Sequence, residues 1–265
     1  MNLLKIVGIF CLMLGSKISA MENKPSNAST KKPLGIYFGG FGGWGFSSAD
    51  VSQKGMAFLP ASSGGTLSVD AKGSSKDSGF GFGGLHLGYE WNGISYIVPA
   101  IELEGFYYAG TQKADDLVND SIRLSHHDFS DTFPMRVGTI LVNGLIAYSN
   151  QYLTPYLGVG VGAGITSIHD ADSKQIKPLE VGINHFNSDT SSSNTTFACQ
   201  AKGGFRFPIT TYFRPFIEYR FLYFSPLNYT FGSTQYPTHS STSSWEVRFS
   251  QFYQNLFSVG MDFTF

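Results

Sequence analysis

The chain is built from short segments of alternating residue character, joined by connections of two lengths. From residue 34 onward, stretches rich in glycine, aromatic and β-branched residues are separated by stretches of serine, aspartate, asparagine, threonine and lysine. None of them sustains the 3.6-residue period of an amphipathic helix, so the sequence predicts strands and no helices. The expected strands are 34–46, 78–91, 97–109, 133–149, 155–168, 195–207, 213–225 and a last one that ends at Phe265.

The lengths of the connections limit the architectures that the chain can adopt. Short and long connections take turns along the chain, which an antiparallel barrel in a membrane predicts when both termini lie on the periplasmic side. The predicted fold is therefore all-β: an eight-stranded transmembrane up-and-down β-barrel with short periplasmic turns and long extracellular loops. The short connections are expected around 92–95, 150–154 and 208–212, and the long ones at 47–77, 110–132, 169–194 and 226–244.

Composition supports a membrane barrel. Charged residues make up 14% of the chain and aromatic residues 15%, whereas soluble domains carry about 25% charge. Past residue 20, no apolar run approaches the roughly 20 residues of a spanning helix, and a closed barrel is the other structure that satisfies every backbone group in lipid. A secreted β-sandwich remains an alternative, but it has no reason to sort its loops by length.

The N-terminal residues have the pattern of an export signal. Residues 1–20 place Lys5 before an apolar run that is too short to span a bilayer as a helix. Polar residues 21–33 are expected to form a flexible periplasmic tail, and 34–265 the outer-membrane β-barrel. Loss of the signal leaves 16 basic residues against 19 acidic ones, so nucleic acid is not an expected partner.

Alternation within each strand assigns one face to lipid and the other to the lumen. By this parity, nine charged residues face the lumen, which in an eight-stranded barrel has room only for side chains. Because an isolated buried charge is very costly, we expect these residues to close the lumen as a salt-bridge network. They are Glu90, Glu102, Glu104, Arg136, Lys202, Arg206, Glu218, Arg220 and Asp262.

Two strands are unusual. Segment 133–149 carries apolar residues on both parities, so its register is not readable and a bulge is expected there. In the last strand, alternating apolar residues share one parity from Trp245 to Phe265. A spanning strand needs only about 9–11 residues, so strands should rise above the outer surface, with 66–71 and 179–184 as possible hairpin extensions. Aromatic residues near the strand ends predict two girdles, one that would include Tyr156 at the short-turn end and one that would include Tyr108, Phe133 and Phe224 at the long-loop end.

The end of the chain resembles the signal by which outer-membrane barrels are recognised for assembly, and the residues that carry it are Phe257, Val259, Met261, Phe263 and Phe265. Shorter segments resemble opacity-type and major-surface-antigen barrels: 101–104 their third strand, 153–162 the fifth, 215–220 the seventh and 124–127 an outer loop. The resemblance covers residues 34–265. It implies a membrane-embedded surface antigen, adhesin or narrow porin.

One long connection carries a group of candidate ligands. His126, His127, Asp128 and Asp131 could bind zinc or resemble an outer-membrane protease site. A site needs rigid support, however, and these residues lie within a single loop, which favours a solvated surface. His169 is also interpreted as a loop residue.

Two His–Ser pairs superficially suggest an esterase, His185 with Ser188 and His239 with Ser240. An esterase would need both groups on one strand face with an acid behind the histidine, and a serine-rich loop does not provide this. Cys199 is expected to face lipid as a small apolar residue. No catalytic residue, cofactor or metal site is therefore expected.

The sequence favours a non-enzymatic outer-membrane surface protein whose extracellular loops act in adhesion or host interaction. A narrow porin for small solutes is the alternative, and a lipid A or peptide hydrolase is less favoured. The expected partners are outer-membrane lipid and lipopolysaccharide, the barrel assembly machinery and a host-surface ligand.

Overall fold

The computed structural model describes residues 35–77, 79–91, 96–119, 127–149 and 152–265. The expected signal peptide and tail lie outside these residues. The strands are β1 (Ile36–Phe58), β2 (Thr66–Asp77), β3 (Phe80–Glu90), β4 (Ile97–Asn119), β5 (Asp128–Tyr148), β6 (Thr154–Ile168), β7 (Asp172–Lys177), β8 (Ser192–Arg206), β9 (Phe213–Phe224), β10 (Leu227–Phe231) and β11 (Trp245–Thr264). A short 3-10 turn, η1, spans Ala61–Ser63.

Eight of these strands close into a ring in the order β1–β3–β4–β5–β6–β8–β9–β11–β1, and every pairing is antiparallel. The ring confirms the predicted eight-stranded up-and-down barrel, with each expected strand in its expected place. The connections β3–β4, β5–β6 and β8–β9 are the short ones. No helix among the described residues is long and apolar enough to cross a membrane.

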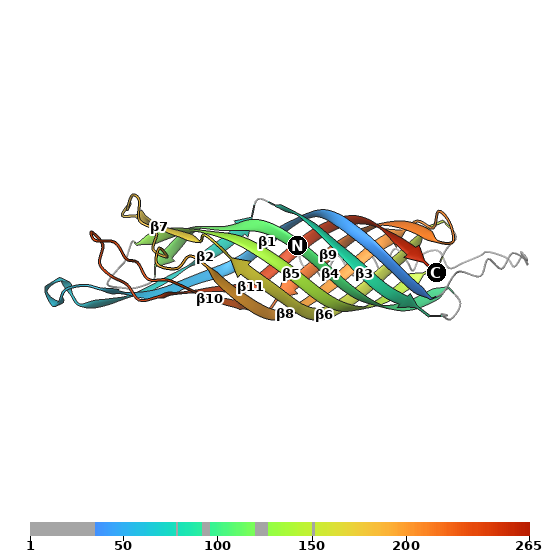
Figure 1. Cartoon of the computed structure of the whole chain (residues 1–265), viewed down its shortest axis with the longest axis horizontal. Coiled ribbons are helices and arrows are strands. Elements are labelled where there is room, and N and C mark those ends of the chain that lie inside the picture. The colour runs from blue at the N-terminus through green and yellow to red at the C-terminus, as the bar shows by residue number, and fades with distance from the viewer. Residues whose placement is uncertain (1–34, 78, 92–95, 120–126, 150–151) are drawn as a thin grey trace, which may run out of the picture. The chain divides into compact units, whose positions relative to one another are not determined.

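The remaining three strands lengthen the wall at the long-loop end. β2 pairs with Ser48–Phe58 of β1, β7 pairs with the first residues of β5, and β10 pairs with the first residues of β11. In Figure 1 they lie at the end of the barrel away from the C-terminus. The predicted extension at 66–71 is thus part of β2, whereas 179–184 is not a strand.

The register of β5 has no bulge within the segment where one was expected. Its pairing with β4 runs unshifted from Ile97–Tyr148 to Ala114–Asp131, and the only shift in this pairing lies beyond Ala114. Val137 and Leu141 are fully buried, while Ile140 and Val142 are about half exposed. The apolar residues on both parities therefore belong to two apolar surfaces, one inside the barrel and one outside.

A bulge does occur in β11, where the sequence pattern looks most regular. Gln251 has a φ of 50°, a left-handed conformation that side chains rarely adopt, and the register with β1 shifts between Ser48 and Asp50. The extra residue reverses the inward and outward faces. Tyr253 and Phe257 point outward, but Trp245, Val247 and Phe249 point inward and are buried, contrary to the single lipid face predicted for this strand.

Candidate functional site

The outer surface of the barrel is divided into two sections of opposite character. Around the short-turn end, outward side chains are large and apolar, among them Leu85, Ile101, Val159 and Phe257, each at least 45% exposed. We call this the band section, and it comprises 36–46, 85–91, 97–107, 138–148, 157–165, 197–207, 213–223 and 253–265. About ten residues of tilted strand cross a hydrocarbon core, so this section spans the membrane.

Beyond the band, the pattern inverts. Most outward residues become polar, such as Lys54, Lys113 and Arg248, and most inward residues become apolar, such as Val51 and Val69. Apolar-in and polar-out is the arrangement of a strand in water. We call this the extended section, and it comprises 48–77, 111–119, 128–136, 166–177, 192–195, 227–231 and 245–251.

Inside the band section, a buried lysine joins three carboxylates. Lys202 Nζ lies 2.5 Å from Glu102 Oε1, 2.7 Å from Glu104 Oε2 and 3.6 Å from Glu218 Oε2. Arg220 reaches the same group, with its Nη1 2.5 Å from Glu104 Oε1 and its Nε against Glu218. Each of these side chains is at most 2% exposed, so their charges are compensated by one another rather than by water.

A second group lies toward the short-turn end. Arg206 donates to Glu90, and its Nε lies 2.9 Å from Asp262. Arg214 Nη1 contacts both Glu90 oxygens, and His86 Nε2 lies 2.8 Å from Asp262 Oδ1. A 4.0 Å contact between Arg206 and Glu102 links this group to the first. The two groups together contain five carboxylates, four cations and His86, and we call them the charge network.

Neutral partners complete the network. Tyr37 donates to Glu102 at 2.9 Å, and Tyr156 donates to Glu218 at 2.8 Å. The guanidinium of Arg206 lies 5.1 Å and 4.6 Å from the centres of these two rings, within the range of a cation–π contact. Each tyrosine therefore contacts both a carboxylate and the guanidinium of Arg206. Tyr156 points inward for this reason and does not belong to the girdle in which it was expected.

Eight of the nine residues expected in the lumen lie in this network. Arg136 does not: it is exposed on the outer wall, because β5 runs without a bulge and buries Val137 instead. Sequence reasoning missed Arg214 and His86 as members. Arg214 shares the parity of Glu218 and Arg220 on β9, so alternation alone could have found it.

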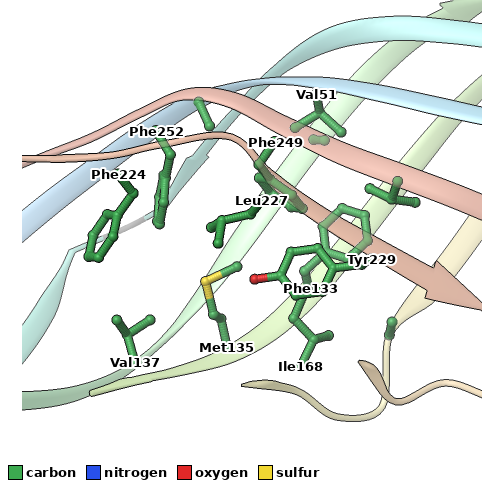
Figure 2. Packing of buried hydrophobic residues seen from close by; sticks show 14 of the residues in the cluster. Val51, Phe133, Met135, Val137, Ile168, Phe224, Leu227, Tyr229, Phe249 and Phe252 are labelled. Atoms are coloured by element: carbon green, nitrogen blue, oxygen red, sulfur yellow. The ribbon is translucent and has the colours of Figure 1, made fainter. Parts of the chain in front are cut away.

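Above the charge network, an aromatic cluster fills the extended section. Phe133 is fully buried, and its ring centre lies 5.1 Å from that of Phe249, 5.9 Å from Phe231 and 6.2 Å from Phe186. Figure 2 shows Phe133 and Phe249 packed with Leu227 and Tyr229 between the strands. We call this cluster the aromatic plug. It includes Phe129, Phe133, Phe186, Phe224, Leu227, Tyr229, Phe231, Trp245, Phe249 and Phe252.

The plug explains the aromatic residues near the long-loop strand ends. Tyr108, Phe133 and Phe224 are buried inside the barrel and do not form part of an outer girdle. Asp131 is buried beside them, and burial raises the pKa of its carboxyl to about 8. Burial of this kind favours the protonated, neutral form of a carboxyl, which suits this apolar interior.

Among the described residues, the loop candidates for a zinc or protease site do not form a group of metal ligands. His126 lies outside the described residues. Asp128 forms an ion pair with Lys177 at 2.9 Å. This pair joins the neighbouring strands β5 and β7 of the barrel wall. His169 and Asp170 are exposed beside Arg136 on the outer surface.

Neither His–Ser pair has the geometry of a nucleophile and its base. His185 Nδ1 bonds the backbone oxygen of Ser173, and Ser188 Oγ bonds Ser233 Oγ. Among the described residues, no hydrogen bond joins His185 to Ser188. His239 Nδ1 contacts the backbone oxygen of Ser240 rather than its hydroxyl. Burial lowers the pKa of His185, so this ring is neutral at pH 7.

The residues of the expected assembly signal line the outer face of β11. Phe257, Val259, Met261 and Phe265 are between 45% and 72% exposed. Phe263 stacks on Phe38 of β1, with ring centres 5.4 Å apart. Cys199 also lies on the outer face, between the buried residues Ala198 and Gln200.

Solved structures of similar shape are outer-membrane barrels. No protein-family model matches the chain, and no curated protein does. The outer membrane protease OmpT of Escherichia coli is 8% identical, with 90% of this chain and 99% of that chain covered and a TM-score of 0.47. OprG of Pseudomonas aeruginosa is 13% identical over 88% and 98%, with a TM-score of 0.44, and Neisserial surface protein A is 15% identical over 84% and 97%, with a TM-score of 0.36. These values support no shared activity, and the fold is established by the strand pairing itself.

Proposed function

We propose that this protein is a non-enzymatic surface protein of a bacterial outer membrane, in which the barrel is the anchor and the long loops contact an external partner. The inversion of the wall supports this proposal most directly. β1 continues from Ser48 to Phe58, beyond the band section, and as far as Lys54 its outward residues are polar while Ala49 and Val51 are buried inside. Because the outer face of the extended section suits water rather than lipid, the loops at its end lie well above the membrane surface.

The other parts of this proposal concern export and partners. Residues 1–20 act as a signal peptide, and the outward apolar residues of β11 are read by the barrel assembly machinery. Arg136 lies just above the apolar band, where a guanidinium suits the phosphates of lipopolysaccharide. The opacity-type resemblance fits an adhesin or surface antigen with a host-surface ligand.

Truncation of the outer loops tests the proposed role. Replacing residues 55–69 with Asn-Gly would join Lys54 to Asp70, which face each other across the β1–β2 hairpin, through a favoured two-residue turn. The other three long loops are shortened in turn. At least one of the four variants is expected to reduce binding of the bacterium to host cells or matrix by about tenfold, or roughly 1.4 kcal/mol.

The control is Ile209→Ser, an exposed position at the short-turn end, which should leave binding unchanged. A shift in gel mobility between unheated and boiled samples shows that each variant still forms a barrel. Binding at the wild-type level in all four loop variants would contradict an adhesive role.

A narrow porin is the alternative function, and the interior argues against it. The charge network and the aromatic plug occupy the barrel one above the other. We therefore expect the purified protein to give no large, stable conductance in a planar lipid bilayer. A steady open level of porin size would show that the lumen conducts and would favour the alternative. An enzymatic role is the least supported, because neither His–Ser pair is assembled.

A further inference from the structure

Three potential ligand atoms converge where two outer loops meet. Glu180 and His185 belong to the loop between β7 and β8, and His239 to the loop between β10 and β11. Glu180 Oε2 lies 3.6 Å from His185 Nε2 and 3.4 Å from His239 Nε2. The three ligand atoms all lie within 4.8 Å of one another. The chain therefore brings two imidazoles and one carboxylate together from positions up to 59 residues apart.

The hydrogen bonds of the two histidines fix which ring nitrogen faces the centre. A backbone carbonyl only accepts, so the contact from His185 Nδ1 to Ser173 O and that from His239 Nδ1 to Ser240 O place the proton on Nδ1 in both rings. With the proton on Nδ1, the lone pair of a neutral ring lies on Nε2, the atom that faces Glu180 in both histidines. A metal-bound histidine has this arrangement, with its other nitrogen donating to a carbonyl or carboxylate.

The carboxylate oxygen that faces the two histidines has no hydrogen-bond donor in the described structure. Glu180 Oε2 is a buried atom that accepts no hydrogen bond within the described part of the chain. A second group of this kind, His86 with Glu102 and Glu104, also lies close together. There, the ammonium of Lys202 already occupies the space between the two carboxylates. Among the described residues, no lysine or arginine pairs with Glu180, whose ion-pair partners are the two histidines themselves.

The site stands on rigid support. The ring of His185 is packed edge-on against Phe129 and Trp245 of the aromatic plug, with centres 5.4 Å and 5.8 Å apart. Its backbone is held at both ends, because His185 N donates to Ser173 O and Thr234 Oγ1 donates to His185 O. Two further hydrogen bonds between Asn187 and Gln235 join the same two loops.

We propose that Glu180, His185 and His239 bind a divalent transition-metal ion, with zinc as the best fit. Zinc takes imidazole nitrogen at about 2.0–2.1 Å and carboxylate oxygen at a similar distance in tetrahedral geometry, which places neighbouring ligand atoms about 3.3 Å apart. The two observed nitrogen–oxygen distances are close to this separation. Glu180 is half-buried and His239 is partly exposed, which leaves the fourth position open to water from the outer surface.

This site ties the β7–β8 loop to the β10–β11 loop across the mouth of the barrel. It differs from the zinc group considered from sequence, which drew on the loop before β5. It also departs from the expectation that the chain has no metal site. The ligands come from two loops, so their spacing along the chain carries no motif.

Calorimetric titration of the refolded, tag-free full chain in detergent with ZnCl₂ tests the proposal. We expect one ion per chain with micromolar or tighter affinity. His239→Ala and Glu180→Gln should each weaken binding by at least about tenfold. His169→Ala is the matched control, because His169 is an exposed histidine on another part of the outer surface, and it should bind zinc as the wild type does.

The two key variants change groups outside the aromatic plug, so the barrel should still fold, and gel mobility before boiling checks this. Cobalt gives a second readout. The wild type should develop the intense visible absorption of tetrahedral Co²⁺, and His239→Ala should not. Unchanged zinc affinity in both His239→Ala and Glu180→Gln, or only the weak absorption of octahedral Co²⁺ in the wild type, would overturn the proposal.

Discussion

Replacing Lys202 with methionine is expected to destabilise the folded barrel by about 3–5 kcal/mol, the range measured when one partner of a buried ion pair is removed. Methionine keeps much of the side-chain length but removes the ammonium that lies within 3.6 Å of Glu102, Glu104 and Glu218. Arg220 cannot compensate three carboxylates, and Arg206, which lies 4.0 Å from Glu102, already pairs with Glu90 and Asp262. The midpoint of urea unfolding in lipid vesicles measures the loss, with folded protein followed by its gel mobility.

Three further variants, Lys174→Met, Glu102→Gln and a double variant, show whether the loss comes from the network. Lys174→Met removes a lysine whose pair with Asp172 is largely exposed, and exposed pairs contribute about 0–1 kcal/mol. The double variant Lys202→Met/Glu102→Gln restores the formal charge balance of the network and should recover much of the stability. If the double variant is as unstable as the sum of its two single variants, the carboxylates are not coupled through Lys202.

Alternation placed most of these residues inside the barrel because they lie on stretches of strand within which the parity is unbroken. Glu102 and Glu104 on β4, and Glu218 and Arg220 on β9, all lie two residues apart on one face. The barrel wall has two faces, so knowing one residue of such a strand fixes the rest. Arg136 was misplaced because β5 is apolar on both faces, and its pattern does not say which face is inside.

The aromatic plug could not be predicted in the same way. Trp245 and Phe249 have the same parity as Phe257, and only the bulge at Gln251 separates inward from outward residues. Glutamine has no preference for positive φ that would mark the position. The proposed metal ligands could not be predicted from the sequence either, because Glu180 and His239 come together only when the two loops fold.

Replacing Phe133 with alanine is expected to cost about 3–5 kcal/mol, the range for removal of a fully buried phenylalanine ring. Phe133 is 0% exposed and contacts Phe186, Phe231 and Phe249. Phe58→Ala is the matched control, because Phe58 is 45% exposed at the outer end of β1. Exposed substitutions of this kind change stability by about 0.5 kcal/mol or less.

The effect should appear first in the extended section, because the band section is held by the charge network and by lipid. Trp245 is buried in the plug, whereas Trp44 and Trp91 are the other two tryptophans and lie outside on the band. With both replaced by phenylalanine, Trp245 fluorescence reports on the plug alone. Phe133→Ala should lower the urea concentration at which this fluorescence shifts to the red, while the loss of strand signal by circular dichroism moves less. Equal shifts of the Trp245 transition in Phe133→Ala and Phe58→Ala would show that the interior of the extended section is not a packed core, and the rigid mouth of the barrel would then need another cause.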